Sequence, residues 1–85
     1  MDIETDEEVR ASHQTIYREL GIQIAYFRRK EGMNQNELAE KAGISRTYLS
    51  NIEAPGVTIP FSTETLFDIA EALGVTVRQL FDFDK

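Results

Sequence analysis

Histidine and cysteine, two side chains that often carry out covalent or metal chemistry, are nearly absent from this 85-residue chain. His13 is the single histidine, and cysteine is absent, so disulfides and thiolate metal sites are excluded. We expect His13 to be a plain exposed residue and acids such as Asp82 and Asp84 to be solvated surface charge. The sequence contains no glycine-rich phosphate loop, serine–histidine arrangement or paired carboxylates. We therefore predict no metal, no cofactor and no enzymatic activity.

A second group of polar side chains is suited to non-covalent recognition. Ser45, Arg46 and Thr47 are consecutive, and Ser50 and Asn51 follow about one helical turn later. A solvated helix face has a similar composition, because surface arginines are common. The clustering of these hydrogen-bonding groups favours a binding face.

Charge is distributed unevenly along the chain. The formal net charge is −6 and the sequence pI is about 4.6, values that by themselves disfavour a nucleic-acid partner. The acidic excess lies in residues 1–14 and 61–85, whereas residues 15–60 hold six bases and five acids. The segment that carries the polar cluster is therefore free of acidic excess, which is compatible with an anionic partner.

Five helices are predicted to position these residues. Apolar residues at spacings near three and four predict a first helix that begins near Asp6 or near Thr15 and reaches Glu31. Capping residues and glycine stops predict four more helices, over 34–43, 45–54, 62–73 and 76–81, and capping boxes at Thr5/Glu8, Asn34/Glu37 and Thr76/Gln79. We treat residues 1–14 as an acidic extension, either a tail or extra turns of the first helix, and residues 15–85 as one domain.

The run QNELAEKAGISRTYLSNIE, residues 35–53, predicts two short helices joined by a tight turn. Ala39 is small, as a close helix crossing requires, and Gly43 stands in the turn, where a positive φ is cheap only for glycine. The apolar contacts that pin both helices to the core are expected at Leu38, Ile44, Leu49 and Ile52. Small, glycine and apolar residues at these offsets predict a helix-turn-helix within a compact, all-α, five-helix domain.

Several stretches resemble the phage-repressor-like Cro/cI (Xre) family of bacterial regulators. The resemblance is carried by LGIQIAYFRR, MNQNELAEKAGIS, TYLSNIE and LFDIAEALGVTVRQLF, and it extends from Leu20 to Phe81. It implies a lambda-repressor-like fold and a sequence-specific, DNA-binding regulator of transcription, with repression as the expected activity. The chain departs from the family in APGVTIP, an uncharged loop where many members have a short basic one.

The resemblance also implies roles for individual residues. The third helix would enter the major groove, where Arg46 would bond guanine and Asn51 adenine, each in a bidentate manner. Arg28 would pair with Glu53 and tie the first helix to the third. Base edges would be read by Ser45, Arg46, Thr47, Ser50 and Asn51. Phosphates would be contacted by Asn34, Gln35, Arg29, Lys30 and Tyr48.

Aromatic residues beside the C-terminus indicate a second surface. Phe81 and Phe83, together with Val77, exceed what a two-turn helix needs as an anchor. They either close the core of the monomer or form a homodimer interface. A homodimer would suit an inverted-repeat operator, because dimers place two recognition helices about 34 Å apart.

The expected partners are double-stranded DNA, a second copy of the chain and a regulatory protein. No membrane partner is expected, because no apolar run approaches the ~20 residues that a membrane helix needs. The N-terminus is acidic, unlike a signal peptide, so we expect a cytoplasmic, nucleoid-associated protein. The acidic ends and the uncharged 54–60 loop also favour an alternative: a protein-interaction module of the same fold, antitoxin-like or regulator-binding, with weak or no DNA binding.

Overall fold

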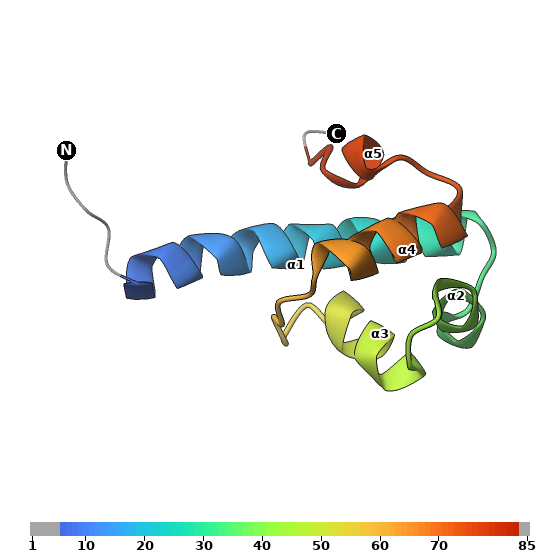
Figure 1. Ribbon diagram of the computed structural model, residues 1–85, viewed down its shortest axis with the longest axis horizontal. Helices are drawn as coiled ribbons and strands as arrows, with labels where there is room; N and C mark the ends of the chain where they lie inside the picture. Colours follow the sequence, from blue (N-terminus) through green and yellow to red (C-terminus); the bar gives the residue numbers. More distant parts are fainter. Residues whose placement is uncertain (1–5, 84–85) are drawn as a thin grey trace.

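The computed structural model describes residues 6–83, with side chains described from His13 onward, and this part of the chain contains helices and no strand. The helices are α1 (Asp6–Lys30), α2 (Gln35–Ala42), α3 (Arg46–Glu53), α4 (Thr63–Leu73) and α5 (Val77–Leu80). In the view of Figure 1, α4 runs along α1, α2 and α3 lie below this pair, and α5 lies above it. The predicted all-α, five-helix architecture is confirmed.

α1 begins at Asp6, the earlier of the two predicted starts, and its first turns extend beyond the other helices (Figure 1). The predicted capping box of Thr5 and Glu8 lies outside the described side chains. Three bases, Arg28, Arg29 and Lys30, occupy the last turn, where positive charge interacts favourably with the helix dipole.

The predicted caps of the shorter helices are present. At the start of α2, the backbone N–H of Glu37 donates to Asn34 Oδ1 at 2.8 Å, and the backbone N–H of Asn34 donates to Glu37 Oε1 at 3.0 Å. Thr76 and Gln79 form the same capping box at α5, and Ser45 and Ser62 cap α3 and α4. Such caps satisfy backbone N–H groups that a helix start leaves unbonded, which fixes where each short helix begins.

A single apolar core joins the five helices. Each helix contributes one fully buried side chain: Ile24, Leu38, Leu49, Ile69 and Leu80. Burial of one such side chain stabilises the fold by about 1.5–3 kcal/mol. None of the described helices is both long and apolar enough to cross a membrane.

The four-residue helix α5 is also held by a polar contact. Gln23, which is buried in α1, donates from Nε2 to the carbonyl oxygen of Asp82 at 2.9 Å. A longer bond, of 3.4 Å, joins the same nitrogen to the carbonyl oxygen of Gln79. This side chain therefore satisfies carbonyl groups at the end of α5 and fixes the C-terminal segment on α1.

Candidate nucleic-acid interface

The turn between α2 and α3 sets the angle between these two helices. Gly43 adopts the left-handed conformation, with φ of 72° and ψ of 29°, which glycine reaches without steric cost. The backbone N–H of Ile44 then donates to the carbonyl oxygen of Ala39 at 3.0 Å, and Ala39 itself is buried. The two helices and their turn have the expected arrangement of a helix-turn-helix.

α3 has one buried and one exposed face. Leu49 and Ile52 are buried in the core. The side chains that the sequence indicated as base readers lie toward solvent: Ser45, Arg46, Thr47 and Asn51 are exposed, and Ser50 is half-buried. The exposed face of α3 therefore presents hydroxyl, guanidinium and amide groups together.

A buried ion pair fixes the C-terminal end of α3. The Nε of Arg28 in α1 donates to Glu53 Oε2 at 2.8 Å, and its Nη2 donates to Glu53 Oε1 at 2.9 Å. A third donor, Nη1, bonds the carbonyl oxygen of Met33 at 2.8 Å. Bidentate geometry of this kind is strong and directional, so the pair links α1, α3 and the segment before α2 in one orientation.

Gln35 joins this network, a contact that sequence reasoning missed. Its Nε2 donates to Glu53 Oε1 at 3.1 Å, across 18 positions in the chain. Within the described residues, no hydrogen bond uses the backbone N–H of Gln35 or Asn36. Open N–H groups at a helix N-terminus form an anion-binding arrangement, and here they lie beside an amide held by Glu53.

Gly21 is a second residue that sequence reasoning missed. It is buried in α1, and a Cβ atom there would overlap the carbonyl oxygen of Ile52 in α3. The backbones of α1 and α3 therefore come into direct contact. The available signal was a glycine inside a helix, which costs about 1 kcal/mol relative to alanine and usually has a packing reason.

Residues 24–80, which include all of α2, α3 and α4, match the helix-turn-helix family. The chain belongs to this family. The resemblance to Cro/cI-like (Xre) regulators that the sequence indicated is thereby confirmed.

Relatives within the helix-turn-helix family include named regulators. The HTH-type transcriptional regulator SinR of Bacillus subtilis (strain 168) is 40% identical over 63 residues, which are 74% of this chain and 56% of SinR. This chain thus spans little more than half the length of SinR. An uncharacterized HTH-type transcriptional regulator, y4dJ of Sinorhizobium fredii (strain NBRC 101917 / NGR234), is 39% identical over 61 residues, which are 72% of this chain and 77% of the relative.

A solved structure agrees with these relationships. The crystal structure of SinR, described as the master regulator for biofilm formation, in complex with DNA, matches with a TM-score of 0.67 and 40% identity. The match covers 74% of this chain and 98% of that chain. The helix-turn-helix domain described above therefore has the same fold as a domain that was crystallised on DNA.

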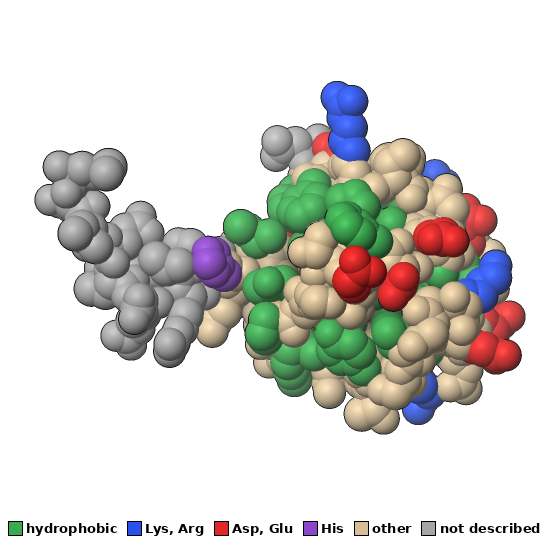
Figure 2. Space-filling view, viewed as in Figure 1, with side chains coloured by type: hydrophobic (Ala, Val, Ile, Leu, Met, Phe, Trp, Pro, Cys, Tyr) green, Lys and Arg blue, Asp and Glu red, His purple; other side chains and the backbone are tan. Residues whose placement is uncertain are grey.

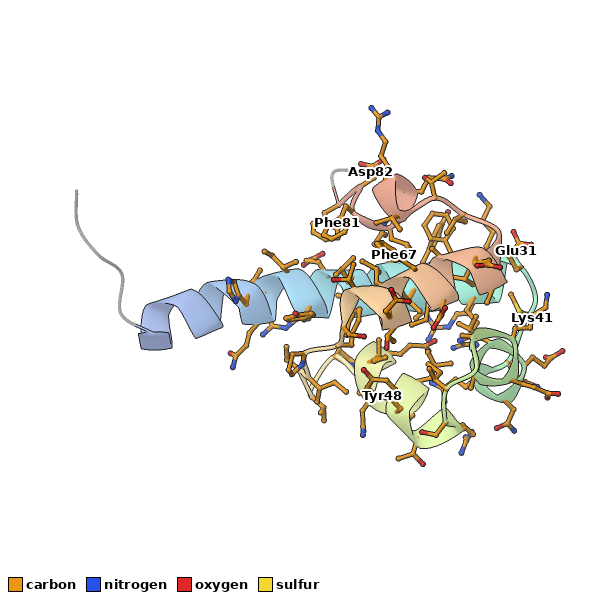
Figure 3. The ribbon with its side chains drawn as sticks, in the orientation of Figure 1. Glu31, Lys41, Tyr48, Phe67, Phe81 and Asp82 are labelled. Atoms are coloured by element: carbon orange, nitrogen blue, oxygen red, sulfur yellow. The ribbon has the colours of Figure 1, made fainter. Side chains whose placement is uncertain are left out.

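The residues that we expect to contact phosphates do not all have the same surroundings in this chain. Arg29 and Lys30 are exposed at the end of α1, and Lys30 Nζ lies 6.0 Å from the centroid of the Tyr26 ring. Tyr48 is half-buried and packs against the core, so only part of its side chain is available (Figure 3). The loop between α3 and α4 carries no charged residue from 54 to 62.

The C-terminal aromatic residues have different exposures. Val77 and Phe83 are half-buried and pack against the core of their own chain. Phe81 is 45% exposed, and its ring centroid lies 6.0 Å from that of Phe83 (Figure 3). It lines an apolar groove with residues from α1 and α4, namely Ile16, Tyr17, Leu20 and Leu66. Of the three residues expected at a dimer interface, Phe81 thus has the most exposed side chain.

Proposed function

We propose that this helix-turn-helix protein is a sequence-specific DNA-binding regulator of transcription, a repressor that binds an inverted-repeat operator as a homodimer. The exposed polar face of α3 carries the proposal. Reading base edges requires side chains held on a rigid element. The Arg28–Glu53 pair and the close contact at Gly21 supply that rigidity.

In this proposal α3 lies in the major groove. Arg46 bonds guanine O6 and N7, and Asn51 bonds the adenine edge, because their donors and acceptors match those bases. Shorter hydroxyl contacts come from Ser45, Thr47 and Ser50. Gln35 and Asn34 hold a phosphate at the N-terminus of α2, with Arg29, Lys30 and Tyr48 as further backbone contacts.

The similarity to SinR supports DNA as the partner, since the SinR structure is a complex with DNA. Regulation of transcription is the activity in the names of both relatives. A repressor of this kind acts on the chromosome, which places the protein in the cytoplasm at the nucleoid. Dimerisation through Phe81 gives two recognition helices, as an inverted repeat requires.

The experiment that tests this function is selection from a random duplex library with the purified chain. We expect enrichment of a short motif in two inverted halves, whose centres lie 10–10.5 base pairs apart or a multiple of that. Arg46→Ala should relax the motif at one base position, whereas Arg78→Ala, which removes an exposed arginine from α5, should leave the motif unchanged. Recovery of no motif by the unmodified chain would rule out sequence-specific binding.

An alternative function, a protein-interaction module, is favoured by the uncharged loop at 54–60 and by the acidic ends of the chain. Salt dependence separates the two functions. DNA affinity should fall with a log–log slope near −0.9 for each phosphate neutralised. Binding to a protein partner with no detectable duplex binding at low salt would favour the alternative.

A further inference from the structure

The outer face of α4 combines acidic side chains with an exposed aromatic ring. Glu64, Phe67, Asp68 and Glu71 are all exposed, and Phe67 is 47% exposed (Figure 3). Lys41 of α2 lines a shallow depression with Asp68 and Glu71 and is the nearby base. Figure 2 shows acidic and hydrophobic side chains intermixed on the side of the molecule that α4 occupies. We call Glu64, Phe67, Asp68 and Glu71 the acidic face.

The solvent side of α1 has the opposite charge and a similar apolar content. Arg18, Ile22, Tyr26 and Arg29 follow one another at spacings of three or four, which puts them on one face of the helix. Ile22 is 45% and Tyr26 46% exposed, although two large apolar side chains on a solvated helix face are unusual. Lys30 extends this surface over the Tyr26 ring. We call these five residues the basic face. Glu19, which is half-buried, lies within the same arc of the helix and offsets part of its positive charge.

The two faces lie on opposite sides of the molecule. At about 100° per residue, Ile22 lies roughly half a turn from Ile24, which is fully buried in the core. The acidic face is likewise opposite to the buried side of α4, which contains Ile69 and Leu73. Because α4 packs against α1 across this core, the two faces point away from each other.

We propose that a second copy of this chain docks head to tail, with the acidic face of one copy against the basic face of the next. This arrangement pairs opposite charges and covers Phe67 with Ile22 and Tyr26. Pairing the acidic face with itself would instead juxtapose like charges, which costs free energy. The contact is heterologous, so it leaves one face of each kind open and does not close at two copies.

The head-to-tail contact does not require DNA binding, but it would add a property to the proposed function. Each face is small, so free copies associate weakly. Copies held on neighbouring DNA sites meet at a high effective concentration. The part of the basic face that the proposed DNA contacts do not use, namely Arg18, Ile22 and Tyr26, then links them. Bound protein would in this way spread from one operator to adjacent duplex, a property that a homodimer alone does not provide.

The test is sedimentation velocity of the full chain without DNA, at low salt and up to millimolar concentration. All proteins carry Phe81→Ser, so that the homodimer of the proposed function does not contribute. We expect the sedimentation coefficient to rise beyond the value of a dimer and to fall as salt screens the contact. Glu71→Arg and Arg18→Glu, at exposed positions, should each weaken association about fivefold.

Two comparisons make the test specific. Glu71→Arg reduces the net negative charge, so weaker association cannot come from general repulsion. In an equimolar mixture of the Glu71→Arg and Arg18→Glu proteins, the intact basic face of the first meets the intact acidic face of the second. Mixed pairs should therefore form more tightly than either variant associates with itself. A chain that stays monomeric, or variants that associate like the parent, or a mixture that recovers no pairs, overturns the proposal. Each of these results leaves the DNA-binding function untouched.

Discussion

At the scale of residues, the positive charge of α3 is concentrated in one side chain. Arg46 is the cation of this helix and is exposed at its first turn, among neutral hydrogen-bonding groups. Counterion release from DNA gives affinity that does not depend on sequence, and neutral groups contribute little to it. The neutral groups of α3 should therefore act mainly through contacts to base edges, which discriminate between sequences.

Arg46→Ala should cost about 1–3 kcal/mol of binding free energy on the selected operator and relax the preference at one base position. The reason is the loss of a bidentate contact to one base. Titrations of the selected duplex, of single-base variants and of random duplex measure both effects. An equal loss on specific and random DNA would show that Arg46 contacts phosphate and does not read a base.

The side chain of Gln35 bonds Glu53 within the protein, and we also expect it to contact a DNA phosphate. Gln35→Ala should weaken binding to all duplexes by a similar factor, because a phosphate contact carries no sequence information. It should also lower the free energy of unfolding by about 1 kcal/mol, through loss of the bond to Glu53. Duplex titrations and urea denaturation measure the two effects, with Gln14→Ala, at an exposed position in α1, as the control. Selective loss on one sequence would contradict the phosphate assignment.

At the scale of elements, α3 is held in place at both of its ends. Ser45 caps its start, and Glu53 at its end is bonded to Arg28 and Gln35. Between these points the core side chain Leu49 is fully buried. An eight-residue helix is marginal in isolation, so its stability and its direction come from these tertiary contacts.

Gly21→Ala tests the close approach of α1 to α3. The added methyl group would overlap the backbone of Ile52, which cannot move without displacing α3. We expect the free energy of unfolding to fall by about 1–3 kcal/mol, even though alanine favours the helix. Gly56→Ala is the matched control, because a Cβ there meets nothing within 4 Å. Equal stability of the two variants in urea denaturation would show that the contact is looser than described.

At the scale of the whole molecule, exposed large apolar side chains lie on three surfaces formed by helices, and Val57 is a further one in the loop after α3. Phe81 lies beside the C-terminal groove, Phe67 on the outer face of α4, and Ile22 with Tyr26 on the solvent side of α1. Large apolar side chains in contact with water are typical of association sites when several share one surface, as Ile22 and Tyr26 do. In our proposals, the C-terminal groove serves the homodimer, and the outer faces of α4 and α1 serve the head-to-tail contact.

Phe81→Ser should abolish the homodimer at micromolar concentration and leave the fold intact, because this ring is nearly half exposed. Sedimentation velocity measures the oligomeric state, and circular dichroism checks the helices. Val57→Ser, which replaces a side chain that is 47% exposed in the loop after α3, is the control. A dimer that persists in the Phe81→Ser protein would place the interface elsewhere.

The sequence by itself determined the helices and the motif, because their signals are local. Caps such as Asn34 with Glu37 act over three residues, and the apolar period within each helix specifies its buried face. Gly43 and the apolar positions around it were sufficient to predict the helix-turn-helix, and the Arg28–Glu53 contact followed from the family resemblance.

The tertiary structure alone decided which distant groups meet. Gln35 bonds Glu53, Gln23 bonds the carbonyl of Asp82 across 59 positions, and Gly21 contacts α3. These contacts depend on how the helices cross, and helix crossing is set by the packing of the whole core, which no local pattern encodes. For the same reason the sequence left open whether Phe81 faces the core or the solvent.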